Sequence, residues 1–191
     1  MFRSLFMQSF IFIGYRCTGK TTVARKLADR LGIPLFDSDV EIECRAGKSI
    51  AEIFAQEGES AFRDREESAI VEILARPSPF VLSTGGGAIL RQSVRKRLRR
   101  AGRVIWLTAT PETILRRMTN DAASKRMRPN LTALPMLDEI TALLELRFSL
   151  YAETSHETID TESRTADEIV EIVLHARRHE EHKDCTKDTQ K

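Results

Sequence analysis

The sequence predicts an α/β protein with a parallel sheet, and two observations carry this prediction. Short apolar runs alternate with longer helical stretches along the 191 residues, which is typical of parallel strands joined by helices. The first apolar run is followed by a glycine-bounded loop and a helical pattern, the strand–loop–helix order of a phosphate-binding fold. The expected strands cover residues 10–13, 34–36, 80–83, 104–107 and 158–159.

Helices are expected between these strands and after the last of them. The segment 60–75 shows the pattern: apolar residues such as Phe62, Ile70 and Ile73 form one stripe, and charged residues fill the opposite face. Thr110 before Pro111 is typical of a helix start with a threonine cap. The expected helices cover 20–31, a pair within 40–56, then 60–75, 92–100, 111–119, 135–150 and 165–178.

The composition excludes several classes of protein. The net charge of +2 is too small to indicate nucleic-acid binding, and no apolar stretch approaches the roughly 20 residues that span a bilayer. Cys17, Cys44 and Cys185 are scattered, without disulfide or metal-ligand spacing, and fit reduced thiols in a cytoplasm. We therefore expect a cytoplasmic, monomeric enzyme that acts on a small molecule, with no nucleic-acid or membrane partner.

The length suits one domain with one sizeable core, which we place over residues 1–178. Residues 120–134 are polar and basic and contain Pro129, so they are predicted to form a mobile excursion between two helices. Residues 179–191 are mostly charged and polar and would bury almost nothing, which predicts a disordered tail.

The loop from Gly14 to Thr21 has the spacing G-x-x-x-x-G-K-[ST] of a phosphate loop. Its backbone N–H groups and the start of the following helix would form an anion-binding concavity. Lys20 would bridge the β- and γ-phosphates, and the Thr21 hydroxyl would hold Mg²⁺. A chance glycine turn is the alternative, but strand, spacing, Lys and Thr all agree with a nucleoside triphosphate site. The expected nucleotide-binding residues here are Gly14, Tyr15, Arg16, Cys17, Thr18, Gly19, Lys20, Thr21 and Thr22.

Two carboxylates, Asp37 and Asp39, follow the second expected strand, at the edge where open parallel sheets bind ligands. Two residues apart in an extended segment, they would project to the same side. One could help to position Mg²⁺ while the other orients a substrate hydroxyl or accepts its proton. No acid ends the strand 80–83, which favours Asp37 as the metal partner. The alternative for either residue is a simple helix cap.

Two further segments could recognise an anion. Arg63 and Glu66 are neighbours on one helix face, so the carboxylate could orient the guanidinium while its other donors grip a ligand. Gly85, Gly86 and Gly87 follow a strand and would let a ligand approach the backbone closely. A solvated ion pair and a flexible turn are the respective alternatives.

Basic residues complete the set of candidates. Arg128, fixed before Pro129 in the basic excursion, could close over a triphosphate and neutralise the charge that develops during transfer. Arg147 is a second candidate for gripping an anion, with an ordinary surface arginine as the alternative.

Together these segments resemble the shikimate kinases, within the nucleoside monophosphate kinase-like phosphate-loop fold. The order of Asp-x-Asp, Phe-Arg-x-x-Glu and triple-Gly elements is more specific than the phosphate loop alone. The resemblance covers 11–174. Its pieces are the phosphate loop, Phe36–Asp39, 47–54, 58–63 with Glu66, 81–87, Arg128-Pro129, Arg147-x-x-x-Tyr151 and 159–161.

The resemblance implies a five-stranded parallel sheet, a substrate-binding subdomain at about 40–74 and a lid at about 118–135. It implies ATP-dependent phosphorylation of the 3-hydroxyl of shikimate, with Mg²⁺. Lys20, Asp39 and Arg128 would be catalytic, and Thr21 and Asp37 would lie on the metal side. Arg117 would lie by the adenine. The substrate would be held by Asp39, Arg63, Gly85, Gly86, Gly87 and Arg147.

One departure from the family pattern falls inside the phosphate loop. Cys17 stands where the family commonly has glycine, and its Cβ would be tolerated if its φ stays negative. Two other functions stay open from the residues. A related hydroxy-acid kinase, such as a gluconate kinase, would also use paired arginines. A nucleotide-binding homologue without catalysis is the third alternative.

Overall fold

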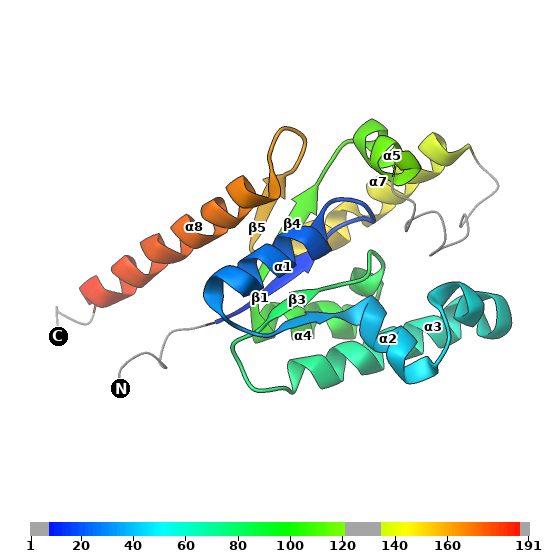
Figure 1. The fold of residues 1–191 in the computed structure, drawn as a ribbon, viewed down its shortest axis with the longest axis horizontal. Coiled ribbons are helices and arrows are strands. Elements are labelled where there is room, and N and C mark those ends of the chain that lie inside the picture. The colour runs from blue at the N-terminus through cyan, green and yellow to red at the C-terminus, as the bar shows by residue number, and fades with distance from the viewer. Residues whose placement is uncertain (1–7, 121–134, 188–191) are drawn as a thin grey trace.

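The structure, a computed structural model, describes residues 8–120 and 135–187, with no account of the side chains of 177–187. Its centre is a sheet of five parallel strands in the order β2-β3-β1-β4-β5 (Figure 1). This confirms the predicted α/β class and the parallel five-stranded sheet. The strands are β1 Ser9–Ile13, β2 Leu35–Asp37, β3 Val81–Ser83, β4 Gly102–Thr108 and β5 Glu157–Asp160.

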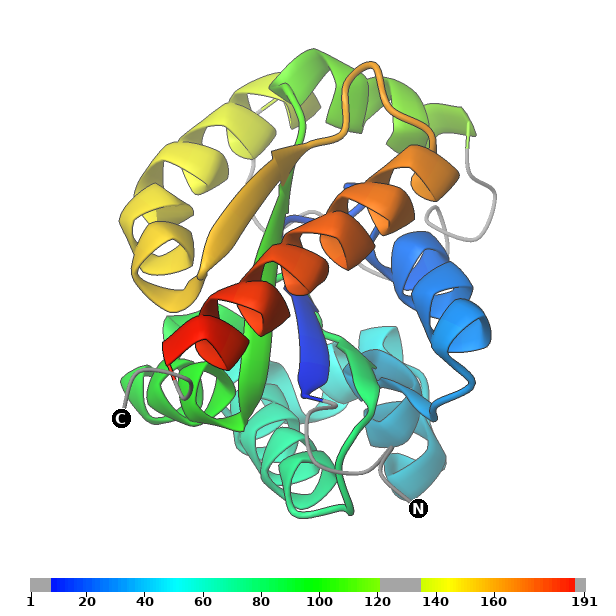
Figure 2. The ribbon, with the colours of Figure 1, turned by 90° about the vertical axis from the view of Figure 1, so that its left-hand side faces the viewer.

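Helices cover both faces of the sheet, because alternate residues of a strand point to opposite sides. Phe10 and Phe12 of β1 pack into a core with helices α1 (Lys20–Leu31) and α8 (Ala166–Lys187), and α8 crosses in front of the strands in Figure 2. Ile11 and Ile13 pack on the other side. That second core is built with α3 (Ile50–Leu74), α4 (Gln92–Ala101) and α7 (Met136–Thr154).

A small helical region has its own apolar cluster. Helix α2 (Ser38–Ala46) packs against α3 through Ile42, Ile53 and Phe62, among others (Figure 1, cyan). The sequence predicted separate helices on either side of Gly58, and α3 does consist of two helical segments that meet at this residue, whose φ of 81° and ψ of 175° are not helical. A glycine reaches this conformation without Cβ strain, so the chain can turn there between the two helical segments.

Other helices also end beyond their predicted bounds. Helix α7 continues to Thr154, beyond the predicted end at residue 150, because Tyr151 and Thr154 are buried and extend its packed face. Helix α8 continues to Lys187, so 179–187 are helical and not the disordered tail that the sequence predicted. Charged residues with good helix propensity can prolong a helix without burying any surface. Helix α5 spans Pro111–Asn120, and a 3₁₀ turn, η1, spans Ala88–Leu90.

Candidate active site

The predicted site segments all lie at the carboxyl ends of strands, on the same side of the sheet. The phosphate loop follows β1, Asp37 ends β2, and the glycine segment 85–87 follows β3. Because β3 lies between β1 and β2, Ser83 is paired in register with both Phe12 and Asp37. Parallel strands end at the same side, so this pairing brings the three segments together.

The phosphate loop is held in shape by its own polar groups. Gly14 and Gly19 have φ angles of 144° and 90°, and a Cβ at Gly14 would lie 2.4 Å from the carbonyl oxygen of Leu107. The carbonyl oxygen of Tyr15 accepts hydrogen bonds from Thr18 Oγ1 at 2.8 Å and from Lys20 Nζ at 2.6 Å. The lysine amine is therefore buried inside the loop, whereas Thr22, on the first turn of α1, is exposed.

Cys17 departs from the backbone geometry expected for it. Its φ is 60°, and it alone among the described non-glycine residues has a positive φ. A side chain at this position was expected only with a negative φ, so the backbone here differs from that expectation. The Cys17 carbonyl oxygen accepts a 3.3 Å hydrogen bond from Arg117. Arg117 also donates to Thr161 Oγ1 and to the Thr161 carbonyl, which ties the loop to the segment after β5.

A cluster of oxygen ligands lies between the phosphate loop and the sheet. Thr21 Oγ1 donates to Asp37 Oδ2 at 3.0 Å and lies 3.1 Å from Ser83 Oγ. One carboxylate and two hydroxyls suit Mg²⁺, which prefers oxygen ligands and completes its shell with water and phosphate oxygens. The described residues contain no group of three or more His, Cys, Asp or Glu side chains that could hold a metal ion on their own. These donors fit a magnesium ion that is shared with a nucleotide.

Asp37 is a helix cap, which is the alternative role that its sequence position left open. Its Oδ1 accepts from the backbone N–H of Asp39 at 3.0 Å, which caps α2. Because α2 begins at Ser38, Asp39 lies in a first helical turn and not in the extended segment that the sequence predicted. Ser38 Oγ accepts from the Gly85 N–H at 2.8 Å and so fixes this turn against the glycine segment.

Arg63 is a buried and oriented cation. It is 8% exposed, and it donates to Glu66 at 2.6 Å and to Glu59 at 3.0 Å. Burial alone would lower the pKa of Arg63, but the facing carboxylates of Glu66 and Glu59 outweigh it and raise that pKa above its usual value. A Cβ at Gly87 would lie only 2.2 Å from Arg63 Nη1. The pair with Glu66 is therefore buried against the glycine segment, unlike a solvated surface ion pair.

Arg147 reaches the same glycine segment from α7. It is 6% exposed and donates to the Gly86 carbonyl at 3.4 Å, beside the Tyr151 hydroxyl, which donates to the same oxygen at 2.6 Å. Among the described residues no group accepts from its buried Nε. Burial raises the pKa of Tyr151, so its hydroxyl stays a donor. A Cβ at Gly86 would lie 3.3 Å from the Arg16 backbone nitrogen, so the phosphate loop is the next neighbour.

Three residues that contact the candidate site were not among the site residues predicted from the sequence. Ser83 ends β3 beside the phosphate-loop strand, and its place in the strand could have identified it. Tyr151 was noted only as part of the resemblance. Glu139, which pairs with Arg16 at 3.4 Å, carries no local signal, because the two residues lie 123 positions apart. The predicted Arg128 and most of the predicted lid fall in residues 121–134, outside the described part of the chain.

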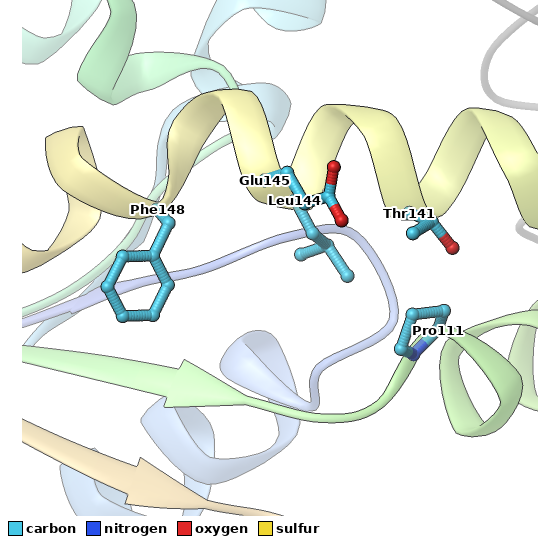
Figure 3. Close-up of a pocket in the computed structure, with 5 residues that line it drawn as sticks. All are labelled: Pro111, Thr141, Leu144, Glu145 and Phe148. Carbon is cyan, nitrogen blue, oxygen red and sulfur yellow. The ribbon is translucent and has the colours of Figure 1, made fainter.

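A separate hollow lies between α7 and the start of α5. It is lined by Pro111, Thr141, Leu144, Glu145 and Phe148 (Figure 3). Its lining is mostly apolar and contains none of the predicted site residues. The predicted site residues therefore gather at the carboxyl ends of the strands, away from this hollow. Within the described residues no helix is long and apolar enough to cross a membrane.

The parallel sheet, the phosphate loop after β1 and the acid, arginine and glycine residues around it define a phosphate-loop α/β phosphotransferase. The chain belongs to the shikimate kinase family, since a family model described as shikimate kinase matches residues 16–177. It is 43% identical to a shikimate kinase of Rhodopirellula baltica over 169 residues, 88% of this chain and 90% of that protein. It is 44% identical to one of Burkholderia thailandensis, with 86% of each chain covered.

Solved structures agree with this assignment. The shikimate kinase of Acinetobacter baumannii in complex with shikimate has a TM-score of 0.81 and 36% identity, covering 88% of this chain and 91% of that one. A gluconokinase of Sinorhizobium meliloti has a TM-score of 0.57 and 16% identity, covering 95% and 98%. The second likeness shows a shared fold alone.

Proposed function

We propose that this kinase transfers the γ-phosphoryl group of ATP to the 3-hydroxyl of shikimate. The observation that carries the proposal is the convergence of two buried arginines on one glycine segment. Arg63 lies against Gly87, Arg147 donates to Gly86, and Gly86 adjoins the backbone of the phosphate loop. A hydroxy acid whose carboxylate binds these two arginines would have its hydroxyls close to a bound triphosphate.

The proposed grip on the substrate follows from the geometry of guanidinium groups. A planar fork binds a carboxylate through two parallel hydrogen bonds, which a lysine cannot do. Glu66 and Glu59 fix the plane of Arg63, and the Tyr151 hydroxyl shares the Gly86 carbonyl with Arg147. We therefore assign substrate binding to Arg63, Arg147 and the backbone of residues 85–87. Of these, Arg63 belongs to the proposed substrate-binding subdomain at about 40–74.

The proposed nucleotide side uses the loop 14–22, with Lys20 as its buried cation and Arg117 beside the adenine. Thr21 and Asp37 would hold Mg²⁺, and Ser83 lies within reach of Thr21. A bound magnesium ion would neutralise negative charge on the phosphates. The lid at about 118–135, with Arg128, stays part of the proposal.

In this mechanism the protein positions the two reactants and supplies fixed charge, since phosphoryl transfer needs little covalent chemistry from it. Asp39, fixed in the first turn of α2, would orient the substrate hydroxyl and accept its proton. Lys20 would stabilise the charge on the transferred group. A cytoplasmic location and a monomeric state complete the proposal. Reduced cysteine thiols would suit such a location.

The test is the release of ADP from ATP and Mg²⁺ with shikimate, with gluconate and with no acid. We expect rapid release with shikimate only, together with a new phosphate ester on the sugar-like acid by ³¹P NMR. Release that depends on gluconate would favour the related hydroxy-acid kinase. Tight ATP binding without release in any of the three mixtures would indicate a nucleotide-binding protein that lacks catalysis.

A further inference from the structure

A buried ion pair joins the phosphate loop to the helix that carries Arg147. Glu139 lies in the first turns of α7 and is 1% exposed, and its Oε1 accepts from Arg16 Nη2 at 3.4 Å. Arg16 lies within the phosphate loop, and its side chain is 18% exposed. A carboxylate buried this deeply needs a paired cation, because leaving it alone in a poorly solvated place is costly. Glu139 therefore restricts where the Arg16 side chain can lie.

Two arginines lie near the ring of Tyr15. The guanidinium carbon of Arg16 is 5.6 Å from the ring centroid, and that of Arg147 is 6.0 Å from it. Cations near an aromatic face are attracted by its quadrupole, more strongly where water is excluded. Tyr15 is 2% exposed and packs with Ile114 and Ile140, so the ring is a fixed surface against which both cations rest.

The loop backbone depends on the same residues. The Tyr15 carbonyl oxygen accepts from Lys20 and Thr18, and the Arg16 backbone nitrogen adjoins Gly86. Arg16 Nε is buried, and no group among the described residues accepts a hydrogen bond from it. This N–H therefore remains available as a donor in addition to the Nη2 group that binds Glu139. Fixing the Arg16 side chain from outside thus fixes the turn whose N–H groups would surround a phosphate.

We propose that Glu139 is a positioning residue of the phosphate loop. Through Arg16 it holds the loop in the shape that binds polyphosphate, and so it links nucleotide affinity to helix α7. A loop that is already ordered loses less conformational entropy on binding, so the link strengthens nucleotide binding without any contact between Glu139 and the ligand. The inference rests on the proposed function only in taking the loop as the nucleotide site.

A double-mutant cycle on ADP affinity tests this without reference to the acid substrate. Glu139→Gln keeps the shape of the side chain and removes its charge, and Arg16→Met removes the cation. We expect each variant to bind MgADP about tenfold more weakly by calorimetry, and the double variant to be no weaker than Arg16→Met alone. Arg16→Lys should recover most of the affinity, because it keeps a charge within reach of Glu139.

Controls separate this role from a merely structural ion pair. Glu145→Gln changes an exposed acid on the same helix and should leave both melting temperature and MgADP affinity unchanged. If Glu139→Gln binds MgADP like the parent, or if the two losses add in full, the proposal is wrong. Should Glu139→Gln unfold, Glu139→Asp and Arg16→Met provide the same comparison. Normal MgADP binding by folded Arg16→Met would also overturn it.

Discussion

The phosphate side of the site is one continuous segment, residues 14–21 from the end of β1 into the start of α1. The proposed acid side instead joins Arg63 of α3, Gly87 after β3 and Arg147 of α7. The first is stabilised within itself, by the hydrogen bonds of Lys20 and Thr18 to one carbonyl. The second exists only when α3, α7 and the sheet are packed together. The two sides meet at Gly86 and Gly87, so substitutions at these two neighbouring glycines should affect different sides of the site.

Asp39→Asn should have the largest effect, because the proposed base belongs to neither side and acts where they meet. We expect kcat to fall by about a thousandfold, within the range for losing a general base, with MgADP affinity and shikimate KM little changed. Steady-state kinetics and calorimetry check this. The control is Asp29→Asn, an exposed acid on α1. Turnover near that of the parent would remove Asp39 from the catalytic role.

Lys20→Met should impair the phosphate side of the site and leave the acid side unchanged. The buried amine is the fixed positive charge of the loop, and losing such a donor costs about 3 kcal/mol in the barrier, roughly a hundredfold in kcat. Shikimate binding measured without nucleotide should stay as in the parent. Lys26→Met, which loses only an exposed ion pair with Asp167, should be nearly silent. A large loss of shikimate affinity in Lys20→Met would mean that the two sides are not separable.

Gly87→Ala should perturb the acid side of the site, because the new Cβ needs space that another side chain occupies. Its Cβ would lie 2.2 Å from Arg63 Nη1, and Glu66 and Glu59 hold that guanidinium in place, so the fork must shift. We expect shikimate KM to rise about tenfold with ATP KM nearly unchanged. Gly86→Ala adjoins the backbone of Arg16 and should show the opposite pattern. Identical profiles for the two alanines would contradict the division.

The same division explains what the sequence could predict. The phosphate loop is contiguous, and the Thr21–Asp37 contact follows from strand ends at one edge, so both could be inferred from order and spacing. The pairing of Arg16 with Glu139 depends on how α7 packs, which no local pattern specifies. Asp39 was expected in an extended segment because the start of α2 at Ser38 depends on the Asp37 cap.

Cys17→Gly should have the smallest effect and an unusual sign. Cys17 has a φ of 60°, a left-handed conformation that costs a non-glycine residue about 1–2 kcal/mol. After the extra entropy lost by a glycine, the variant should gain about 1 kcal/mol, or a rise of roughly 2–4 °C in melting temperature. Cys44→Gly, the same change inside helix α2, should instead lower it by a similar amount. Calorimetric melting of both variants gives the comparison. If both glycines destabilise, interactions of the Cys17 side chain outweigh the backbone strain, and the phosphate side depends on more than the shape of its main chain.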